Sequence, residues 1–271
     1  MNEPLLSVEA LGVTYRSRRG PVEAVRGVSF ACGREKLGIV GESGSGKSTV
    51  GRAIMGLLPR GARLRATELA FQGQDLTRCS ESQMTSLRGR RIAMILQEPK
   101  FALNPVMTIG DQIAEAYRAH HRVSGTAARG HGLEMLAAVH IRNPARMWRA
   151  HAHELSGGMA QRAMIAMMLA PGPDLLIADE PTSALDVISR QSVLAILDEL
   201  VAERGMGLML ISHDLGLVAS FCDRVLVMEK GAVVEQLPAD RLARARHPYT
   251  KALLAARPRL EVEMAARSRN R

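Results

Sequence analysis

The fold of this 271-residue chain is decided by one segment, Gly41-Glu42-Ser43-Gly44-Ser45-Gly46-Lys47-Ser48-Thr49. It fits the phosphate-loop pattern G-x-x-x-x-G-K-[ST] at every fixed position. Glycines in such a loop let backbone N–H groups converge on phosphate oxygens without Cβ clashes. The segment is therefore predicted to bind the phosphates of a nucleotide through its backbone and through the side chains of Lys47 and Ser48.

The sequence on either side of the loop predicts a strand and a helix. Residues 36–40 form a short apolar run typical of a buried strand, and residues 50–55 continue as a helix. This context places bound phosphates at a helix N-terminus, where the helix dipole favours anions. Lys47 is expected to reach the β- and γ-phosphates, and the Ser48 hydroxyl to ligate Mg²⁺. The strand–loop–helix context disfavours the alternative of a glycine-rich turn that binds nothing.

A second motif, an acidic pair, lies far downstream of the loop. Asp179 and Glu180 end the wholly apolar run of residues 175–178, which is typical of a strand in a parallel sheet. Carboxylates at the C-terminal end of such a strand lie beside the phosphate loop in open α/β sheets. Asp179 is therefore the candidate Mg²⁺ ligand, and Glu180 the candidate general base for an attacking water. Taken alone, such a pair is more often a solvated strand end.

A third motif lies between the other two, Leu155-Ser156-Gly157-Gly158-Met159-Ala160-Gln161-Arg162. It resembles the signature motif of the nucleotide-binding subunits of ABC transporters, which is far more specific than a phosphate loop alone. The resemblance runs from about residue 6 to about residue 254. It implies an α/β fold, a P-loop NTPase (RecA-like) core with an antiparallel β layer and an inserted helical sub-domain, and it implies ATP hydrolysis.

The resemblance assigns roles to further residues. Tyr15 resembles the A-loop aromatic that stacks on adenine, Gln97 the Q-loop glutamine and His213 the switch histidine, while Ser183-Ala184-Leu185-Asp186 resembles the D-loop. It implies that Gln97 also ligates Mg²⁺ and that Gln97 and His213 join Glu180 in catalysis. The alternatives are a strand-end amide for Gln97, a core histidine for His213 and a packed aromatic for Tyr15.

The signature motif has two interpretations. Ser156, Gly157 and Gly158 could form a plain helix N-cap with a flexible approach. In the family they close over the γ-phosphate of ATP held by a second ATP-binding subunit, again through the geometry of a helix terminus. The resemblance therefore implies that two subunits, identical or paralogous, share two ATP sites.

The family pattern divides the chain into three parts. The ATPase core covers residues 1–98 and 159–240, the helical sub-domain residues 99–158, and a basic extension residues 241–271. Apolar spacing predicts that residues 99–154 are helical. Beyond the segments above, strands are predicted at residues 6–15, 22–30, 68–71, 92–96, 175–179, 208–212, 224–228 and 232–235, and helices after the signature and at residues 189–203. A turn is predicted around residues 18–20.

Two segments narrow the resemblance to the ATP-binding subunits of oligopeptide, dipeptide and nickel importers. They are residues 87–95, Leu-Arg-Gly-Arg-Arg-Ile-Ala-Met-Ile, and residues 247–254, His-Pro-Tyr-Thr-Lys-Ala-Leu-Leu. Two departures stand out. Many members have arginine where this signature has Ala160, and no cysteine follows Cys222, so an iron–sulfur cluster in the extension is unsupported.

These segments imply a bacterial importer ATPase, peripheral on the cytoplasmic face of the inner membrane. Its partners would be a second ATP-binding subunit, integral membrane permease subunits and, indirectly, a substrate-binding protein. One alternative is a soluble accessory ATPase such as that of the carbon–phosphorus lyase system, which carries a similar C-terminal sequence. Export is less favoured because no membrane domain is fused. ATPases of DNA repair or translation usually carry tandem units, zinc cysteines or coiled-coil arms, which this sequence lacks.

Composition agrees with a folded protein that needs no membrane span. A hydrophobic content of 46% is ample for a core, and no run of 18 apolar residues occurs. The N-terminus shows no signal-peptide pattern. The three cysteines are too widely spaced for a metal or redox motif, so they are expected to be buried or half-buried. A metal pair at His151 and His153 is disfavoured, because the sequence around His153 is ordinary for the family before the signature.

The net charge of +9 suggests nucleic acid at first sight, but its distribution does not. Residues 241–271 hold nine basic and two acidic residues, a net charge of +7, so the preceding 240 residues carry only +2. No nucleic-acid partner is predicted. The basic extension is expected to be a solvated, partly disordered end, and the alternative is contact with anionic lipid headgroups.

Overall fold

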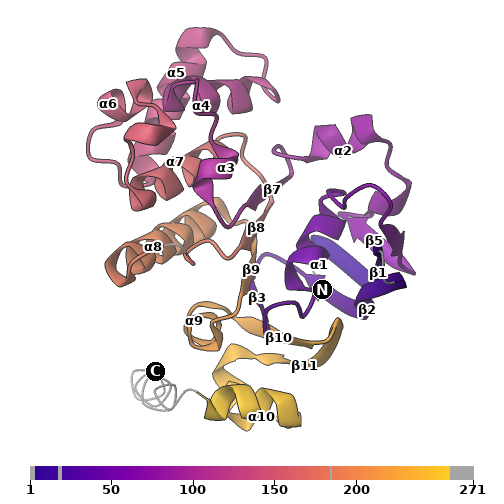
Figure 1. The fold of residues 1–271 in the computed structure, drawn as a ribbon. Coiled ribbons are helices and arrows are strands. Elements are labelled where there is room, and N and C mark those ends of the chain that lie inside the picture. The colour runs from indigo at the N-terminus through magenta and orange to yellow at the C-terminus, as the bar shows by residue number, and fades with distance from the viewer. Residues whose placement is uncertain (1–3, 18–19, 184, 257–271) are drawn as a thin grey trace. The chain divides into compact units, whose positions relative to one another are not determined.

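The computed structural model describes residues 4–17, 20–183 and 185–256, and Figure 1 shows the fold. The chain divides into two units, one of Met1–Met84 with Gly207–Arg271 and the other of Thr85–Met206. These bounds differ from those of the predicted functional parts, so the boundaries at residues 98, 159 and 240 stay a prediction.

The first unit contains the predicted antiparallel layer. β1 (Leu6–Ser17) pairs with β2 (Gly20–Cys32) on one side and with β5 (Glu68–Phe71) on the other. Two short strands complete the layer, β4 (Arg63–Arg65) beside β1 and β6 (Gln74–Asp75) beside β5. The three predicted strands are confirmed. β1 extends two residues further toward the turn, and β2 is two residues longer at each end than predicted. Residues 18 and 19 of the predicted turn lie outside the described residues.

The first unit also contains strands of a mixed sheet, in the order β11-β10-β3-β9. β3 (Lys36–Val40) lies parallel to both β9 (Gly207–Ser212) and β10 (Arg224–Glu229). The chain then reverses into β11 (Ala232–Pro238), which confirms the predicted closing hairpin. Because β3 is central, its side chains meet neighbours on both faces, and its apolar run is explained by burial.

Two helices position this sheet and its loop. α1 (Lys47–Ile54) follows the phosphate loop directly, which confirms the strand–loop–helix prediction, although the helix starts three residues earlier than predicted. α9 (Leu215–Phe221) follows β9 and packs against β3. That close approach requires glycine at position 38, where a Cβ atom would lie 2.1 Å from Val218 Cγ1.

The chain beyond β11 continues into ordered structure. A 3₁₀ helix, η3 (Ala239–Arg244), leads to α10 (Pro248–Ala255), drawn in yellow in Figure 1. Leu242 and Thr250 are fully buried. The prediction of partial disorder is therefore wrong for residues 241–256, although most of them are exposed as predicted, and the rest of the basic extension lies outside the described residues.

The second unit combines two parallel strands with a group of helices. β7 (Ile92–Ile95) pairs with β8 (Leu175–Asp179) in the register that places Ile95 opposite Ala178. β7 ends one residue before the prediction, at the point where Leu96 becomes exposed. The helices are α3 (Pro99–Ala102), α4 (Ile109–Arg118), α5 (Gly125–Ala138), α6 (Pro144–Arg149), α7 (Gly157–Leu169) and α8 (Val187–Arg204). A short 3₁₀ helix of this unit is η2 (Ala152–Glu154), and two short helical segments, η1 (Leu76–Arg78) and α2 (Glu81–Leu87), come before β7 in the chain.

The helices of the second unit pack around an aromatic centre, and the predicted helical character of residues 99–154 is confirmed. α4 and α5 contact each other, and each of them also contacts α6 and α7; Ile113 and Trp148 lie among the buried side chains. Gly110 leaves room for the indole, since a Cβ atom there would lie 2.1 Å from Trp148 Cδ2. No helix in the described ranges combines the length and the apolar character that a bilayer crossing requires.

Candidate nucleotide-binding site

The phosphate loop folds around the ammonium group of Lys47. Lys47 Nζ donates hydrogen bonds to the backbone oxygens of Gly41 at 2.7 Å and Glu42 at 2.8 Å, and to Ser45 Oγ at 3.4 Å. The side chain is only 6% exposed. A cation is thus held at the N-terminus of α1, where helix N–H groups also point outward, and this combination favours an anionic ligand.

Two glycines shape the loop for different reasons. Gly46, the N-cap of α1, has a φ of +99°, and a Cβ atom there would lie 2.4 Å from the backbone oxygen of Ala24. Gly44 has a φ of +81°, but no heavy atom lies within 4 Å of its Cβ position. Glycine is therefore required at position 46 by both close packing and backbone conformation, and at position 44 by backbone conformation alone.

Tyrosine hydroxyls contact the loop at both ends. The Tyr15 hydroxyl donates to Thr49 Oγ1 at 3.2 Å, so Tyr15 lies beside the loop, and its stacking on adenine stays a prediction. At the other end the backbone N–H of Glu42 donates to Tyr249 Oη at 3.1 Å. The sequence does not predict this second contact, although the segment that contains Tyr249 resembles the family's C-terminal sequence.

His213 emerges at the same sheet edge as the phosphate loop. Val40, the last residue of β3, pairs in parallel with Ser212, the last residue of β9, so Gly41 and His213 follow at one edge. His213 is exposed, which rules out its interpretation as a core histidine. Its loop is fixed on both sides, because Asp214 donates its N–H to Ser212 Oγ at 3.0 Å and caps α9 by accepting from the N–H of Leu217 at 3.1 Å.

In the second unit the acidic pair and Gln97 share an edge in the same way. Ile95, the last residue of β7, pairs with Ala178 in the neighbouring parallel strand. Asp179 is the last residue of β8 and Gln97 lies two residues after β7, so both lie at the carboxyl ends of these strands. Gln97 is exposed and Asp179 is buried at 5% exposure. A solvated strand end therefore does not describe Asp179.

Glu180 has an unusual backbone conformation. Its φ is +50°, in the left-handed region that residues with a Cβ atom rarely adopt. The turn is held by Ser183, whose N–H and hydroxyl both donate to the Glu180 backbone oxygen, at 3.2 and 3.1 Å. Strained residues of this kind cluster at functional sites. The side chain is half-buried, so it remains accessible to water.

The signature motif forms the start of α7. Ser156 is the N-cap, and its Oγ accepts from the N–H of Met159 at 3.4 Å. Ser156 and Gly157 are exposed, and Gly158 lies close to α8, since a Cβ atom there would be 3.2 Å from Ser189 Oγ. The N-cap interpretation is confirmed. Capping of a partner's ATP stays a prediction.

The D-loop segment leads into α8. Asp186 caps this helix by accepting from the N–H and the hydroxyl of Ser189 at 3.0 and 2.7 Å, and these hydrogen bonds hold the pKa of Asp186 below its usual value. Val187 and Ile188, directly after it, are 69% and 81% exposed. Ala184 lies outside the described residues.

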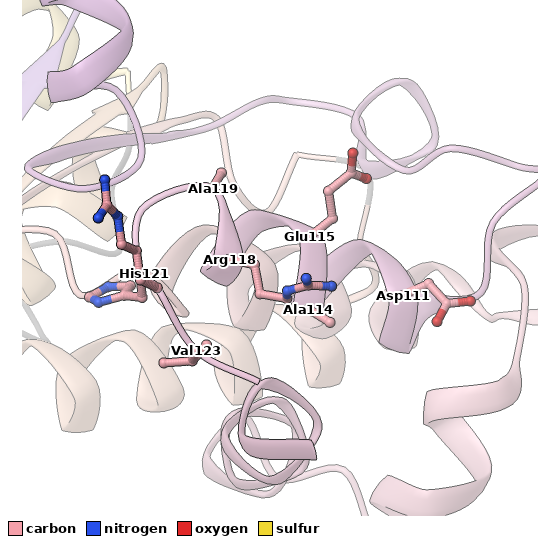
Figure 2. Close-up of a pocket in the computed structure, with 8 residues that line it drawn as sticks. Asp111, Ala114, Glu115, Arg118, Ala119, His121 and Val123 are labelled. Atoms are coloured by element: carbon pink, nitrogen blue, oxygen red, sulfur yellow. The ribbon is translucent and has the colours of Figure 1, made fainter. Parts of the chain in front are cut away.

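Two other places lie outside the predicted nucleotide site. Within the described ranges, no group of three or more histidine, cysteine or acidic side chains is arranged to hold a metal ion, and the rings of His151 and His153 stack at 5.6 Å. A pocket of about 640 Å³ lies along α4 (Figure 2), with Asp111, Glu115 and Arg118 among its lining residues. None of the residues that line it belongs to the predicted site.

Comparison with known proteins identifies the family. The family model described as "ABC transporter" matches residues 25–183, more than half of the chain. A probable peptide ABC transporter ATP-binding protein of Sinorhizobium fredii, y4tR, is 48% identical over 94% of this chain and 77% of its own length. The dipeptide transport ATP-binding protein DppD of Bacillus subtilis is 45% identical over 96% of this chain and 78% of its own length.

Solved structures agree with these relatives. The dimeric structure of MJ0796, a bacterial ABC transporter cassette, has a TM-score of 0.76 at 27% identity and covers 86% of this chain and 98% of its own. A second structure of that cassette, a post-hydrolysis state bound to ADP and Pi, is matched with the same TM-score at 26% identity and the same coverage. This chain therefore belongs to the ABC transporter family and is one of its ATP-binding, ATP-hydrolysing subunits.

Proposed function

We propose that this protein powers a bacterial ABC importer of peptides. The observation that carries the proposal is the phosphate loop closed around Lys47, which suits the polyphosphate of ATP. The peptide class rests on the relatives, whose names refer to peptide and dipeptide transport. Those names favour peptides over nickel chelates, and they favour a transporter over a soluble accessory ATPase.

ATP binding is assigned to the phosphate loop and Tyr15. The backbone amides of residues 43–49 would receive the phosphates, Lys47 would contact the β- and γ-phosphates, and Tyr15 would stack on the adenine. Half-burial of Tyr15 and its hydrogen bond to Thr49 support a place beside the loop.

The chemistry of the donor set fits Mg²⁺. Ser48, Gln97 and Asp179 offer a hydroxyl, an amide and a carboxylate, which are the oxygen ligands that Mg²⁺ prefers. Burial of Asp179 supports this role, because a carboxylate at 5% exposure is stabilised by a cation. When bound, Mg²⁺ neutralises phosphate charge.

Hydrolysis is assigned to Glu180 and His213. The Glu180 carboxylate would accept a proton from the water that attacks the γ-phosphate, and its half-exposed position supports access to that water. His213 would donate a hydrogen bond to the γ-phosphate, and Gln97 would help to orient the water. The exposure of both side chains at sheet edges supports these roles.

We further propose that two ATP-binding subunits close on two ATP molecules. Exposed Ser156 and Gly157 at the start of α7 would cap the ATP bound to the partner subunit. The MJ0796 cassette is a dimer in its solved structure, which supports this arrangement. The further partners would be integral membrane permease subunits and, through them, a substrate-binding protein, with this subunit peripheral on the cytoplasmic face of the membrane.

The first experiment separates chemistry from binding. Glu180→Gln is expected to keep ATP binding and to slow hydrolysis by at least ~10², since loss of a general base typically costs ~10²–10⁴. Lys47→Ala is expected to weaken ATP binding itself. Glu134→Gln, an exposed change on α5, serves as the control and is expected to behave as the parent protein. Near-normal turnover of Glu180→Gln would remove Glu180 from the base role, and unchanged ATP affinity of Lys47→Ala would contradict the loop assignment.

The second experiment tests partnership and cargo. Ser156→Arg is expected to leave ATP binding by the isolated subunit intact and to abolish ATP-driven association and hydrolysis at the site it caps. Weaker binding at this chain's own phosphate loop would exclude the shared-site arrangement. In cells that lack the gene, the parent protein is expected to restore uptake of labelled dipeptides, and Glu180→Gln is not. Restored uptake of nickel without peptide would overturn the peptide class.

A further inference from the structure

One peptide group links the phosphate loop to the C-terminal helix. The bond between Gly41 and Glu42 carries the Gly41 carbonyl, which accepts from Lys47 Nζ at 2.7 Å, and the Glu42 N–H, which donates to Tyr249 Oη at 3.1 Å. A peptide group is planar, so fixing the direction of its N–H also fixes the direction of its carbonyl. The Tyr249 hydroxyl and the Lys47 ammonium therefore hold opposite sides of one rigid unit.

The neighbouring peptide group tightens this linkage. The Glu42 carbonyl accepts from Lys47 Nζ at 2.8 Å and from the N–H of Ser45 at 3.2 Å. The backbone at Gly41 is closely packed on one side, because a Cβ atom there would lie 2.1 Å from the backbone oxygen of Met228 in β10. The hydrogen bond from the Glu42 N–H to Tyr249 Oη opposes rotation of the peptide plane.

Tyr249 is itself held in place by β11. Glu235 accepts from the backbone N–H of Arg246 at 2.6 Å and of His247 at 3.2 Å, directly before α10. The His247 side chain then caps the helix by accepting from the N–H of Tyr249 at 3.3 Å. The hydroxyl thus reaches the loop from a fixed support. Burial raises the pKa of the Tyr249 phenol, so the hydroxyl stays protonated at neutral pH.

We propose that Tyr249 is a positioning residue for ATP binding: it fixes the Gly41–Glu42 peptide plane and thereby the place of the Lys47 ammonium. The proposal rests on the proposed role of Lys47 in binding ATP. It assigns a function to the His-Pro-Tyr-Thr segment near the C-terminus, which otherwise has none in the nucleotide site. The effect is intramolecular and is present in the isolated subunit.

The test is a double-mutant cycle on the full-length subunit. Tyr249→Phe removes the hydroxyl and keeps the ring. The expected result is a two- to tenfold rise in the Kd for ATP, about the loss of one net hydrogen bond. In the Lys47→Ala background the same change is expected to have no further effect, because it acts through Lys47. Tyr117→Phe, in the second unit, is the matched control with unchanged affinity.

A structural role for Tyr249 predicts a different pattern. If the hydroxyl only stabilised α10, Tyr249→Phe would lower the melting temperature, and its effect on ATP affinity would be the same with and without Lys47. That additive result overturns the proposal, as does an unchanged Kd. A second variant, Glu235→Gln, weakens the support of α10 and is expected to raise the Kd in the same direction, again only when Lys47 is present. If Lys47→Ala alone leaves ATP affinity unchanged, the proposed function fails instead.

Discussion

The two left-handed glycines of the phosphate loop allow its folding role to be separated from its binding role. Gly44→Ala and Gly46→Ala both place a Cβ atom on a backbone with positive φ, which costs about 1–2 kcal/mol. For Gly46→Ala the new atom also lies 2.4 Å from the backbone oxygen of Ala24, so β2 or the loop must shift. Overpacking of this kind adds about 1–3 kcal/mol.

These free-energy costs correspond to losses in melting temperature. At roughly 2–4 °C per kcal/mol for a chain of about this size, Gly44→Ala is expected to lose roughly 2–8 °C and Gly46→Ala clearly more, in thermal unfolding followed by circular dichroism. ATP affinity is expected to fall for Gly44→Ala, because its Cβ position opens to the space assigned to phosphate. Gly61→Ala is the matched control, since Gly61 has a φ of +88° and equally open surroundings outside the loop. It should lose as much stability as Gly44→Ala and no ATP affinity.

The outcome that refutes this reasoning is equal destabilisation by Gly44→Ala and Gly46→Ala. Backbone strain alone would then explain both glycines, and the close approach to Ala24 would be irrelevant. Equal losses of ATP affinity in Gly44→Ala and Gly61→Ala would contradict the assignment of the open side of the loop to phosphate.

Three further predictions concern the rest of the fold. Gly110→Ala is expected to lower the melting temperature by several degrees because its Cβ would overlap Trp148. Gly125→Ala, whose Cβ would lie in open surroundings, is expected to change the melting temperature only slightly, as surface substitutions usually do. In the native protein iodoacetamide is expected to alkylate half-buried Cys79 ahead of buried Cys32, as peptide mass spectrometry will show. Burial raises the pKa of the Cys32 thiol from 9.0 to about 12, so its contribution to stability is complete below pH 9.0 and is lost as pH rises to about 12. Cys32→Ala should therefore reduce the loss of stability over that range in denaturant titrations.

Local patterns were sufficient to predict the strands that carry the site. β3 and β8 have the predicted bounds, residues 36–40 and 175–179, because each is a short apolar run that ends in a loop or a charge. Parallel pairing then places Gly41 and His213 at one edge in the first unit, and Gln97 and Asp179 at one edge in the second. Motif spacing thus predicted which strand ends the structure brings together, and the functional roles of the residues there stay a prediction.

Local sequence patterns could not predict that the C-terminal segment folds into ordered structure. Residues 241–256 are rich in arginine and alanine, a composition shared by solvated ends, and their burial depends on partners far away in the chain. Glu42 and Tyr249 are 207 positions apart, and no local periodicity encodes such a contact. The motif resemblance marked this segment as special without indicating what it touches.

In the acidic pair, the backbone conformation places two neighbouring carboxylates in different environments, which the sequence motif alone does not predict. Two consecutive carboxylates in one environment would compete for the same role. Here β8 carries Asp179 into the interior at 5% exposure, and the left-handed turn at Glu180 leaves the next side chain half-buried and accessible to water. Pairs of titratable groups in contrasting environments divide the chemistry between them. The bonds from Ser183 to the Glu180 carbonyl therefore stabilise the conformation that separates the proposed metal ligand, Asp179, from the proposed base, Glu180.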